Sequence, residues 1–327
     1  MTMHKDYSYQ SVLAPYIRDL IAEKRQLGFL YDDQSYQLYR LDQYWIRCGY
    51  PDLYLTGERL ENWICAFQGE SKSSHSKRIS AAKSLAVYLN AHGINCDIPL
   101  NNVGKDHPCI HVLDHTERKQ FFEAVDSYRP DSINRQDYRM ADEYPIIFRL
   151  FYCCGMRNNE VCSLKLTDVD FEKGIITIYN GKGHKDRLVY LSEDMRLLLN
   201  RYHIWLKKWL GYEPYWLFPG RIPEKHIITT SIDRKFREFW NKTQASKHCD
   251  KAPTPHSLRH GFVVDRINSW ILTDIDINVM FLYLSKYLGH KDPDESYYYY
   301  HLAQDAFRII RKKDTVSKEI LPEVRRR

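Results

Sequence analysis

A stretch without helical periodicity, INCDIPLNNVGKDHPCIHVLD, interrupts the chain at residues 94–114 and contains two prolines. The residues before it, 7–95, carry apolar side chains at helical spacing in four segments, three of which end at a glycine. A break of this kind favours an exposed connection over a packed element. We therefore predict two domains, 1–95 and 112–327, joined by a linker at 96–111.

The second domain is predicted to be mostly helical, with one β-hairpin. Helical patterns cover DHTERKQFFEAVDSY and EYPIIFRLFYCC, and the latter ends before Gly155. Further along, the β-rich runs GIITIYN and RLVYLS flank a basic turn that contains glycine, GKGHKD. The predicted fold class of the whole chain is therefore mainly α with a small β-sheet (α+β).

Composition narrows the class of protein. The 327 residues carry a formal net charge of +6, which favours a polyanionic partner. No run of 18 apolar residues is present and the N-terminus lacks an apolar core, so we expect neither a membrane span nor a secretory signal. The eight cysteines form no C-x-x-C pair, and we expect a reduced, cytoplasmic protein. His107, Cys109 and His111 lack a second ligand cluster at a recognisable spacing, so no metal site is expected.

Two short stretches place charged residues at turns. In GMRNNE, Arg157 follows a predicted helix end and Glu160 lies within reach across one helical turn, and by itself this pair is better explained as a surface ion pair. In the hairpin turn GKGHKD, Lys182, His184 and Lys185 form a basic tip that can reach a phosphate. By themselves, these three residues are better explained as a solvated turn.

The stretch TPHSLRH has the pattern of a helix start. Thr254 fits the N-cap and Pro255 fits the first helical position. His256 and Arg259 then share one face near a helix N-terminus, which favours anions. A phosphate site and a capped helix with incidental polar residues explain this stretch equally well.

The stretch LGHKDPDESYYYYH places His290 after a glycine at a helix end. Asp292, Pro293 and Glu295 fit the cap and first turn of a new helix, which would carry the tyrosines at 297–300. Successive residues of a helix point about 100° apart, so the four rings cannot face the same place. Any one of them alone is better explained by packing.

The order of these motifs is more specific than each motif by itself. Arg-x-x-Glu, a hairpin lysine, His-x-x-Arg, Leu-Gly-His and a following tyrosine together resemble the catalytic domain of the tyrosine recombinases, the phage integrase family. The resemblance covers the second domain, and the first domain resembles the core-binding domain of that family with less specificity. We do not expect the arm-type DNA-binding domain that many phage integrases carry in front. The resemblance implies six catalytic residues, which are Arg157, Lys182, His256, Arg259, His290 and Tyr299.

The family pattern also bears on neighbouring residues. Lys182 in GKG matches the hairpin lysine better than Lys185 does, and Glu160 matches the acidic residue that buttresses an arginine. The step of 31 residues from Arg259 to His290 is longer than the family leads us to expect. The segment SWILTDIDINVM is therefore expected to hold an insertion.

The tyrosine run requires a choice of register. In the family the nucleophile commonly lies nine residues after the histidine of Leu-Gly-His, in a Tyr-x-His setting, and this position is Tyr299. Tyr300 is the alternative if the helix start slips by one residue. Tyr298 is expected to pack, because it shares a helix face with Leu302.

The resemblance implies a site-specific DNA recombinase or integrase that cleaves and rejoins strands through a covalent 3′-phosphotyrosine intermediate, without a cofactor. Its expected partners are double-stranded DNA and other copies of the chain, in a homotetramer on two DNA sites. Relaxation of DNA by type IB topoisomerase chemistry and a catalytically silent DNA-binding protein are the alternatives.

Overall fold

The computed structural model describes two compact units, Met1–Pro108 and Cys109–Arg327, and the division falls inside the predicted linker. No helix in the described part of the chain combines the length and the apolar character needed to cross a bilayer. The described residues are 6–104, 110–179, 181, 186–249, 251–271, 273, 275–290 and 297–302.

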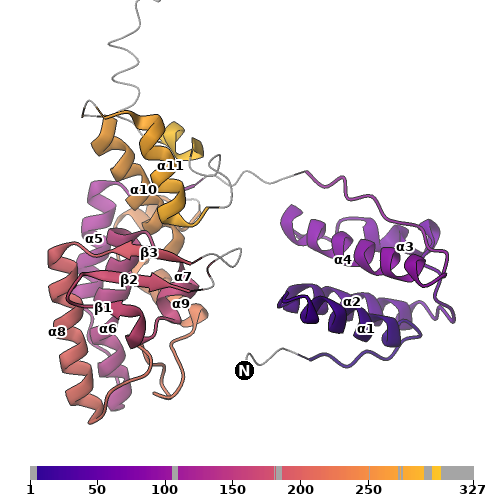
Figure 1. Cartoon of the computed structure of the whole chain (residues 1–327), viewed down its shortest axis with the longest axis horizontal. Coiled ribbons are helices and arrows are strands. Elements are labelled where there is room, and N and C mark those ends of the chain that lie inside the picture. Colours follow the sequence, from indigo (N-terminus) through magenta and orange to yellow (C-terminus); the bar gives the residue numbers. More distant parts are fainter. Residues whose placement is uncertain are drawn as a thin grey trace, which may run out of the picture. The chain divides into compact units, whose positions relative to one another are not determined.

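The first unit is built from four helices, as predicted (Figure 1). Helix α4 packs against both α1 and α2, and the enclosed core includes Trp45 and Trp63, each 1% exposed or less. Helix α3 ends at Ile64, and the backbone is extended at the next residue, Cys65. The helices are α1 (Ala14–Gln26), α2 (Asp32–Arg47), α3 (Gly57–Ile64) and α4 (Lys72–Ala91).

A buried ion pair anchors the basic start of α4. Arg78 is fully buried, donates hydrogen bonds from Nε and Nη2 to the carboxylate of Glu70, and lies 3.8 Å from the ring centre of Phe67. This arginine therefore belongs to the interior of the unit. Its removal would leave a buried carboxylate without its partner.

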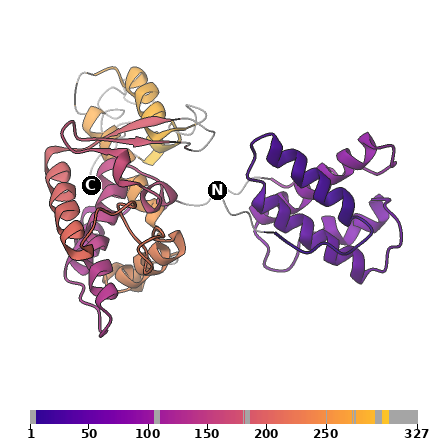
Figure 2. The same cartoon turned by 60° about the horizontal axis from the view of Figure 1, so that its bottom comes forward.

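In its described residues, the second unit combines seven α-helices with a small antiparallel sheet in the order β1-β2-β3 (Figures 1 and 2). Strands β2 and β3 pair from Ile175↔Tyr190 to Ile178↔Arg187, so the predicted hairpin is confirmed, as is the predicted fold class. The helices are α5 (His115–Asp126), α6 (Arg135–Cys154), α7 (Asn158–Cys162), α8 (Glu193–Leu210), α9 (Thr229–Trp240), α10 (Pro255–Ile271) and α11 (Ile277–Leu288). The strands are β1 (Val169–Asp170), β2 (Ile175–Ile178) and β3 (Arg187–Tyr190), and short 3₁₀ turns are η1 (Leu166–Asp168), η2 (Ala245–His248) and η3 (Tyr298–Leu302).

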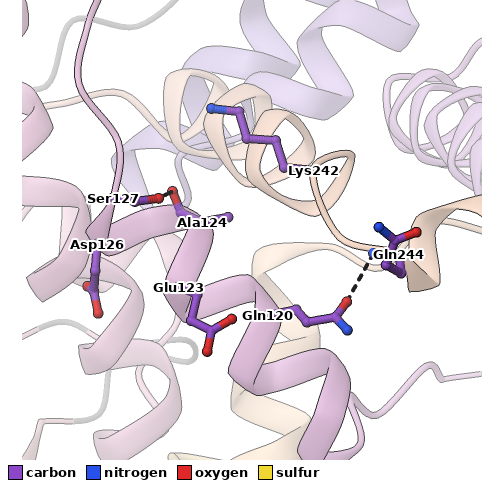
Figure 3. Close-up of a pocket in the computed structure, with 7 residues that line it drawn as sticks. All are labelled: Gln120, Glu123, Ala124, Asp126, Ser127, Lys242 and Gln244. Atoms are coloured by element: carbon purple, nitrogen blue, oxygen red, sulfur yellow. Dashed lines mark hydrogen bonds between the residues drawn. The ribbon is translucent and has the colours of Figure 1, made fainter.

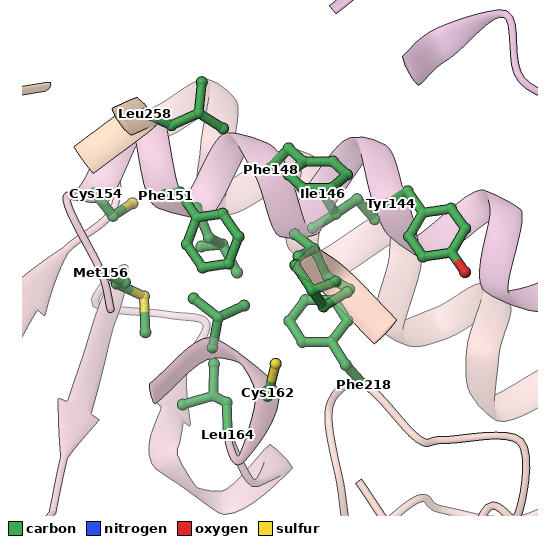
Figure 4. Close-up of a cluster of buried hydrophobic side chains, with 14 of the residues drawn as sticks. Tyr144, Ile146, Phe148, Phe151, Cys154, Met156, Cys162, Leu164, Phe218 and Leu258 are labelled. Atoms are coloured by element: carbon green, nitrogen blue, oxygen red, sulfur yellow. The ribbon is translucent and has the colours of Figure 1, made fainter. Parts of the chain in front are cut away.

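Helix α6 is the central element of the second unit. It contacts α5, α7, α8 and α10, and apolar side chains along it pack in a cluster that Figure 4 shows. Phe148 and Phe151 of α6 and Leu258 of α10 are each 1% exposed or less in that cluster. Burial of such side chains contributes about 2 kcal/mol each, so α6 holds α10 in a fixed place.

The segment SWILTDIDINVM contains the last turn of α10 and the first turn of α11. The two helices contact each other and share an apolar cluster with Phe262, Phe281 and Leu288. Together they fill most of the sequence between Arg259 and His290. The insertion expected in this segment stays a prediction.

Gly155 ends α6 with the backbone in the left-handed region (φ +61°), and a Cβ built on it would lie 2.5 Å from the ring of Phe262. Gly155→Ala therefore combines backbone strain with a steric clash, and we expect a loss of about 2–4 kcal/mol in the free energy of unfolding. Denaturant unfolding of the whole chain measures this loss.

Gly211 is the matched control. It ends α8 at φ +81°, but open space surrounds its Cβ position. Gly211→Ala should therefore cost only about 1 kcal/mol, from strain alone. Equal losses in the two variants would contradict the close contact between Gly155 and α10.

Candidate active site

Arg157 stands between two helices, where the sequence predicts it. Helix α6 ends at Gly155, and Arg157 is the N-cap position of α7. Its backbone N–H and its Nη1 donate to the Glu160 carboxylate at 2.8 and 2.9 Å, and its Nη2 donates to the Gly289 carbonyl at 2.7 Å. The predicted pair of Arg157 and Glu160 therefore exists, and it also reaches the turn after α11.

A second arginine, which the sequence analysis did not single out, holds the same carboxylate. Arg187 begins β3 and donates to both oxygens of Glu160 at 2.7 and 2.6 Å. Its Nε donates to the Tyr287 carbonyl at 2.8 Å. Arg187 thereby ties the hairpin to α7 and α11, and a bidentate contact of this kind also fixes geometry.

The two arginines determine the charge state of Glu160. Burial alone would raise the pKa of its carboxyl group, but the hydrogen bonds and positive charge of Arg187 and Arg157 outweigh burial and lower the pKa to about 2. The side chains of Glu160 and Arg157 are 8% and 18% exposed, so this pair is largely buried and is not the surface ion pair that the motif alone would suggest.

Arg259 lies in the interior, 1% exposed, on the first turns of α10. Its Nη1 donates to the Gly155 carbonyl at 2.5 Å and its Nη2 to the Leu288 carbonyl at 2.8 Å. Burial, together with the positive charge of Arg157, lowers its pKa to about 10, which leaves the guanidinium charged at neutral pH. The site therefore contains a desolvated cation held by the C-terminal carbonyls of two helices.

The Leu-Gly-His turn brings His290 to this cation. Gly289 has φ +64°, which favours glycine, and a Cβ there would lie in tight contact, 3.2 Å from both Arg157 Nη1 and Arg187 Cδ. His290 Nε2 lies 3.3 Å from Arg259 Nη2. Because a guanidinium only donates, Nε2 is the acceptor in this contact.

The start of α10 lies where the sequence predicts it. Pro255 is the first helical residue, and the Thr254 N–H before it donates to Ser257 Oγ at 3.2 Å. His256 is exposed whereas Arg259 is buried. The His256 ring stands perpendicular to that of His260, 4.5 Å away.

The tyrosine run lies partly in the 3₁₀ turn η3, Tyr298–Leu302. Tyr299 is 5% exposed, and its hydroxyl lies 2.7 Å from His260 Nδ1, so His260 is a second residue of the site that the motifs did not reveal. The prediction that Tyr298 packs beside Leu302 is wrong, because Tyr298 is 41% exposed. A 3₁₀ turn has three residues per turn, so residues four apart do not share a face.

Several predicted residues lie outside the described part of the chain. These are Lys182, His184 and Lys185 of the hairpin turn, the capping residues Asp292, Pro293 and Glu295, and the side chains of Tyr300 and His301. The structure thus brings together Arg157, Arg259, His290 and Tyr299, with His256 beside them across the His260 ring.

Other places in the described residues offer less chemistry. No group of three or more metal-ligating side chains is found among them. A hollow of about 850 Å³ is lined by residues of α5 and by Lys242 and Gln244, with Gln244 N donating to Gln120 Oε1 at 3.0 Å (Figure 3). It shares no lining residue with the arginine site.

The low pKa of Glu160 predicts a pH-dependent stability. The unfolded chain, with an ordinary carboxyl pKa near 4.5, binds this proton before the folded chain does, so stability is lost as the pH falls from about 4.5 to about 2. The loss amounts to about 3 kcal/mol. In Glu160→Gln this part of the pH dependence should disappear, as measured by denaturant unfolding at pH 7 and pH 3. An unchanged pH slope in the variant would contradict the buried ion pair.

Comparison with known proteins agrees with this geometry. The model of the phage integrase family matches residues 111–305, which are 195 of the 327 residues and include all six predicted catalytic positions. The tyrosine recombinase XerA of Saccharolobus solfataricus is 25% identical over 257 residues, which cover 78% of this chain and 77% of that protein. The tyrosine recombinase XerD of Neisseria meningitidis is 25% identical over 243 residues, which cover 72% and 74%.

Solved structures share the fold. A XerH recombinase bound to a palindromic difH substrate has a TM-score of 0.64 at 17% identity, with 92% of this chain and 83% of that chain covered. The Tn1549 transposon integrase in complex with a circular intermediate DNA has a TM-score of 0.62 at 17% identity, with 93% and 100% covered. The family match extends over more than half of the chain and confirms the resemblance seen in the motifs: the chain belongs to the phage integrase family of site-specific tyrosine recombinases.

Proposed function

We propose that this recombinase binds double-stranded DNA and cleaves and rejoins it through a covalent 3′-phosphotyrosine intermediate on Tyr299. The observation that carries the proposal is the convergence of Arg157, Arg259, His290 and Tyr299 from four separate elements of the fold. Two guanidinium groups and an imidazole beside a buried phenol suit a phosphodiester and a nucleophile. The DNA complexes of XerH and of the Tn1549 integrase support the choice of DNA.

Arg157 and Arg259 have N–H groups that can donate hydrogen bonds to a phosphate. A guanidinium has five N–H donors. Among the described residues, Arg259 uses three of them and Arg157 uses two. The remaining donors would stabilise the negative charge that builds on the phosphoryl oxygens, and one such donor is typically worth about 3 kcal/mol.

The tyrosine solves the problem of breaking a phosphodiester without losing its energy to water. The covalent phosphotyrosine retains the bond energy until a DNA hydroxyl attacks it, so no high-energy cofactor is needed. A free phenol has a pKa of about 10, and forming the phenolate at pH 7 costs roughly 4 kcal/mol. Nearby cations lower that cost, and His256 would accept the proton.

Lys182 is proposed to protonate the departing 5′-oxygen. It belongs to the turn that joins β2 to β3, and the pairing of Ile178 with Arg187 closes this turn at its base. The bidentate contact of Arg187 with Glu160 ties the same base to the site. A lysine in this turn would therefore act from a loop whose base is held beside the site.

The first unit is proposed to clamp DNA as a core-binding domain at residues 1–95, with 96–111 as the linker and 112–327 as the catalytic domain. The division of the chain between Pro108 and Cys109 supports this assignment. Recombination between two sites requires four active sites, so we propose a homotetramer on two duplexes. We also propose that the protein acts in the cytoplasm, because its proposed substrate is DNA.

Relaxation of DNA by type IB topoisomerase chemistry, and DNA binding without catalysis, are not favoured by the family match. An assay with two labelled target duplexes separates the three functions. Recombinant products identify a recombinase, and relaxation without products would identify the topoisomerase. The absence of any trapped covalent adduct on a nicked suicide substrate would identify the silent binder.

Tyr299→Phe should abolish covalent attachment to a suicide DNA substrate and leave DNA affinity within about twofold, because only the nucleophilic oxygen is removed. Denaturing gels measure the adduct and fluorescence anisotropy measures binding. Tyr298→Phe is the matched control and should form the adduct normally, since Tyr298 is exposed. An adduct that persists in Tyr299→Phe, or that is lost only in Tyr300→Phe, would overturn the assignment.

Lys182→Ala should slow cleavage by at least 100-fold, the usual effect of losing a general acid. DNA with a 5′-bridging phosphorothioate has a leaving group that needs no protonation, so it should restore the rate of this variant. Lys185→Ala is the control in the same turn and should need no rescue. Rescue of Lys185→Ala alone would move the general acid to Lys185.

A further inference from the structure

The hydroxyl of the proposed nucleophile has a described partner that lies outside the six residues of the family pattern. Tyr299 Oη lies 2.7 Å from Nδ1 of His260, which follows Arg259 in α10. The two residues are 39 positions apart in sequence, and the contact joins η3 to α10. The tyrosine is 5% exposed, and a buried hydroxyl requires a hydrogen-bond partner because it has lost most of its water.

The rings around Tyr299 restrict its orientation. The His260 ring lies 5.3 Å from the Tyr299 ring, and the His290 ring is nearly parallel to it, at 8° and 6.4 Å. His260 is itself packed edge-on against His256. The phenol is thus placed between a histidine of α10 and the histidine that follows α11.

His260 is held in its neutral form. Burial, together with His256, Arg259 and His290, lowers its pKa to about 3. These groups face it from α10 and from the turn after α11. A neutral imidazole with so low a pKa is a poor proton acceptor at equilibrium, but its unprotonated nitrogen accepts a hydrogen bond well. This separates the role of His260 from that of a general base.

The contact also distinguishes among the tyrosines. Tyr297 is 39% exposed and stacks on Phe281, and Tyr298 is 41% exposed. Tyr299 has the described hydrogen bond to His260. Among the tyrosines of the run whose side chains the structure describes, Tyr297 to Tyr299, this contact therefore marks Tyr299.

We propose that His260 positions the nucleophile: Nδ1 accepts the hydrogen bond of the Tyr299 hydroxyl and orients it beside Arg259 and His290 before the scissile phosphate is attacked. This inference rests on the proposed function, because it assumes that Tyr299 is the nucleophile. It adds a seventh side chain to the constellation, one that acts through the tyrosine and needs no contact with DNA.

Two substitutions in the full-length protein test the proposal. His260→Phe keeps a ring of similar size but removes the nitrogen, and we expect the rate of adduct formation on a suicide substrate to fall on the order of tenfold. His260→Asn retains a polar atom close to the Nδ1 position, and its rate should stay within about threefold of the wild type. Dissociation constants for DNA should be unchanged in both variants, because His260 acts after binding.

The outcomes are distinct. A wild-type rate in His260→Phe would overturn the proposal, and so would an equal loss of rate in both variants with unfolding curves and DNA affinity intact. A loss of DNA affinity in step with the rate would show that His260 supports the DNA site in general, which also overturns it. An adduct in Tyr299→Phe would contradict the proposed function itself, whereas an inactive Tyr299→Phe beside an active His260→Phe would remove only this inference.

Discussion

The buried guanidinium of Arg259 is the constraint on which the site depends. A cation that is 1% exposed must be compensated, and its partners are the carbonyls of Gly155 and Leu288, at the C-terminal ends of α6 and α11. Those carbonyls are the ones that a helix leaves without an internal partner, at its negative end. The Arg259 side chain of α10 thereby donates hydrogen bonds to the C-terminal carbonyls of two other helices. It fixes the position of the turn that follows each of them. Arg157 and His290 are carried by these same two turns.

The charge balance of the site follows from this arrangement. Among the described residues, Arg157, Arg187 and Arg259 gather near the carboxylate of Glu160, which contacts two of them directly. These four groups have two positive charges in excess, and mutual repulsion adds to burial in lowering the pKa of Arg259. A phosphodiester anion would relieve this repulsion. Glu160 therefore holds the arginines together while leaving the site positive.

Much of the site could be predicted from sequence because its residues lie next to helix starts and helix ends. Gly155 before Arg157, Pro255 before His256 and Gly289 before His290 mark helix ends and starts, which short-range rules identify. Arg187 and His260 were not predicted as residues of the site, for a different reason. Their contacts span 27 and 39 residues and leave no local pattern, although His260 is the last residue of TPHSLRH and Arg187 is the first residue of RLVYLS. The packing of Tyr298 was mispredicted because an α-helical period was applied to a 3₁₀ turn.

The central claim, that the phosphate is transferred to Tyr299, is tested most directly by locating the DNA on the protein. Wild-type enzyme trapped on a suicide substrate is digested with nuclease and trypsin, and the nucleotide-bearing peptide is fragmented by mass spectrometry. Trypsin releases residues 292–308 as one peptide, which contains all four tyrosines of the run. We predict that the nucleotide is attached to Tyr299 through its 3′-phosphate. Attachment to Tyr298 or Tyr300, or to a residue outside this peptide, would contradict the account.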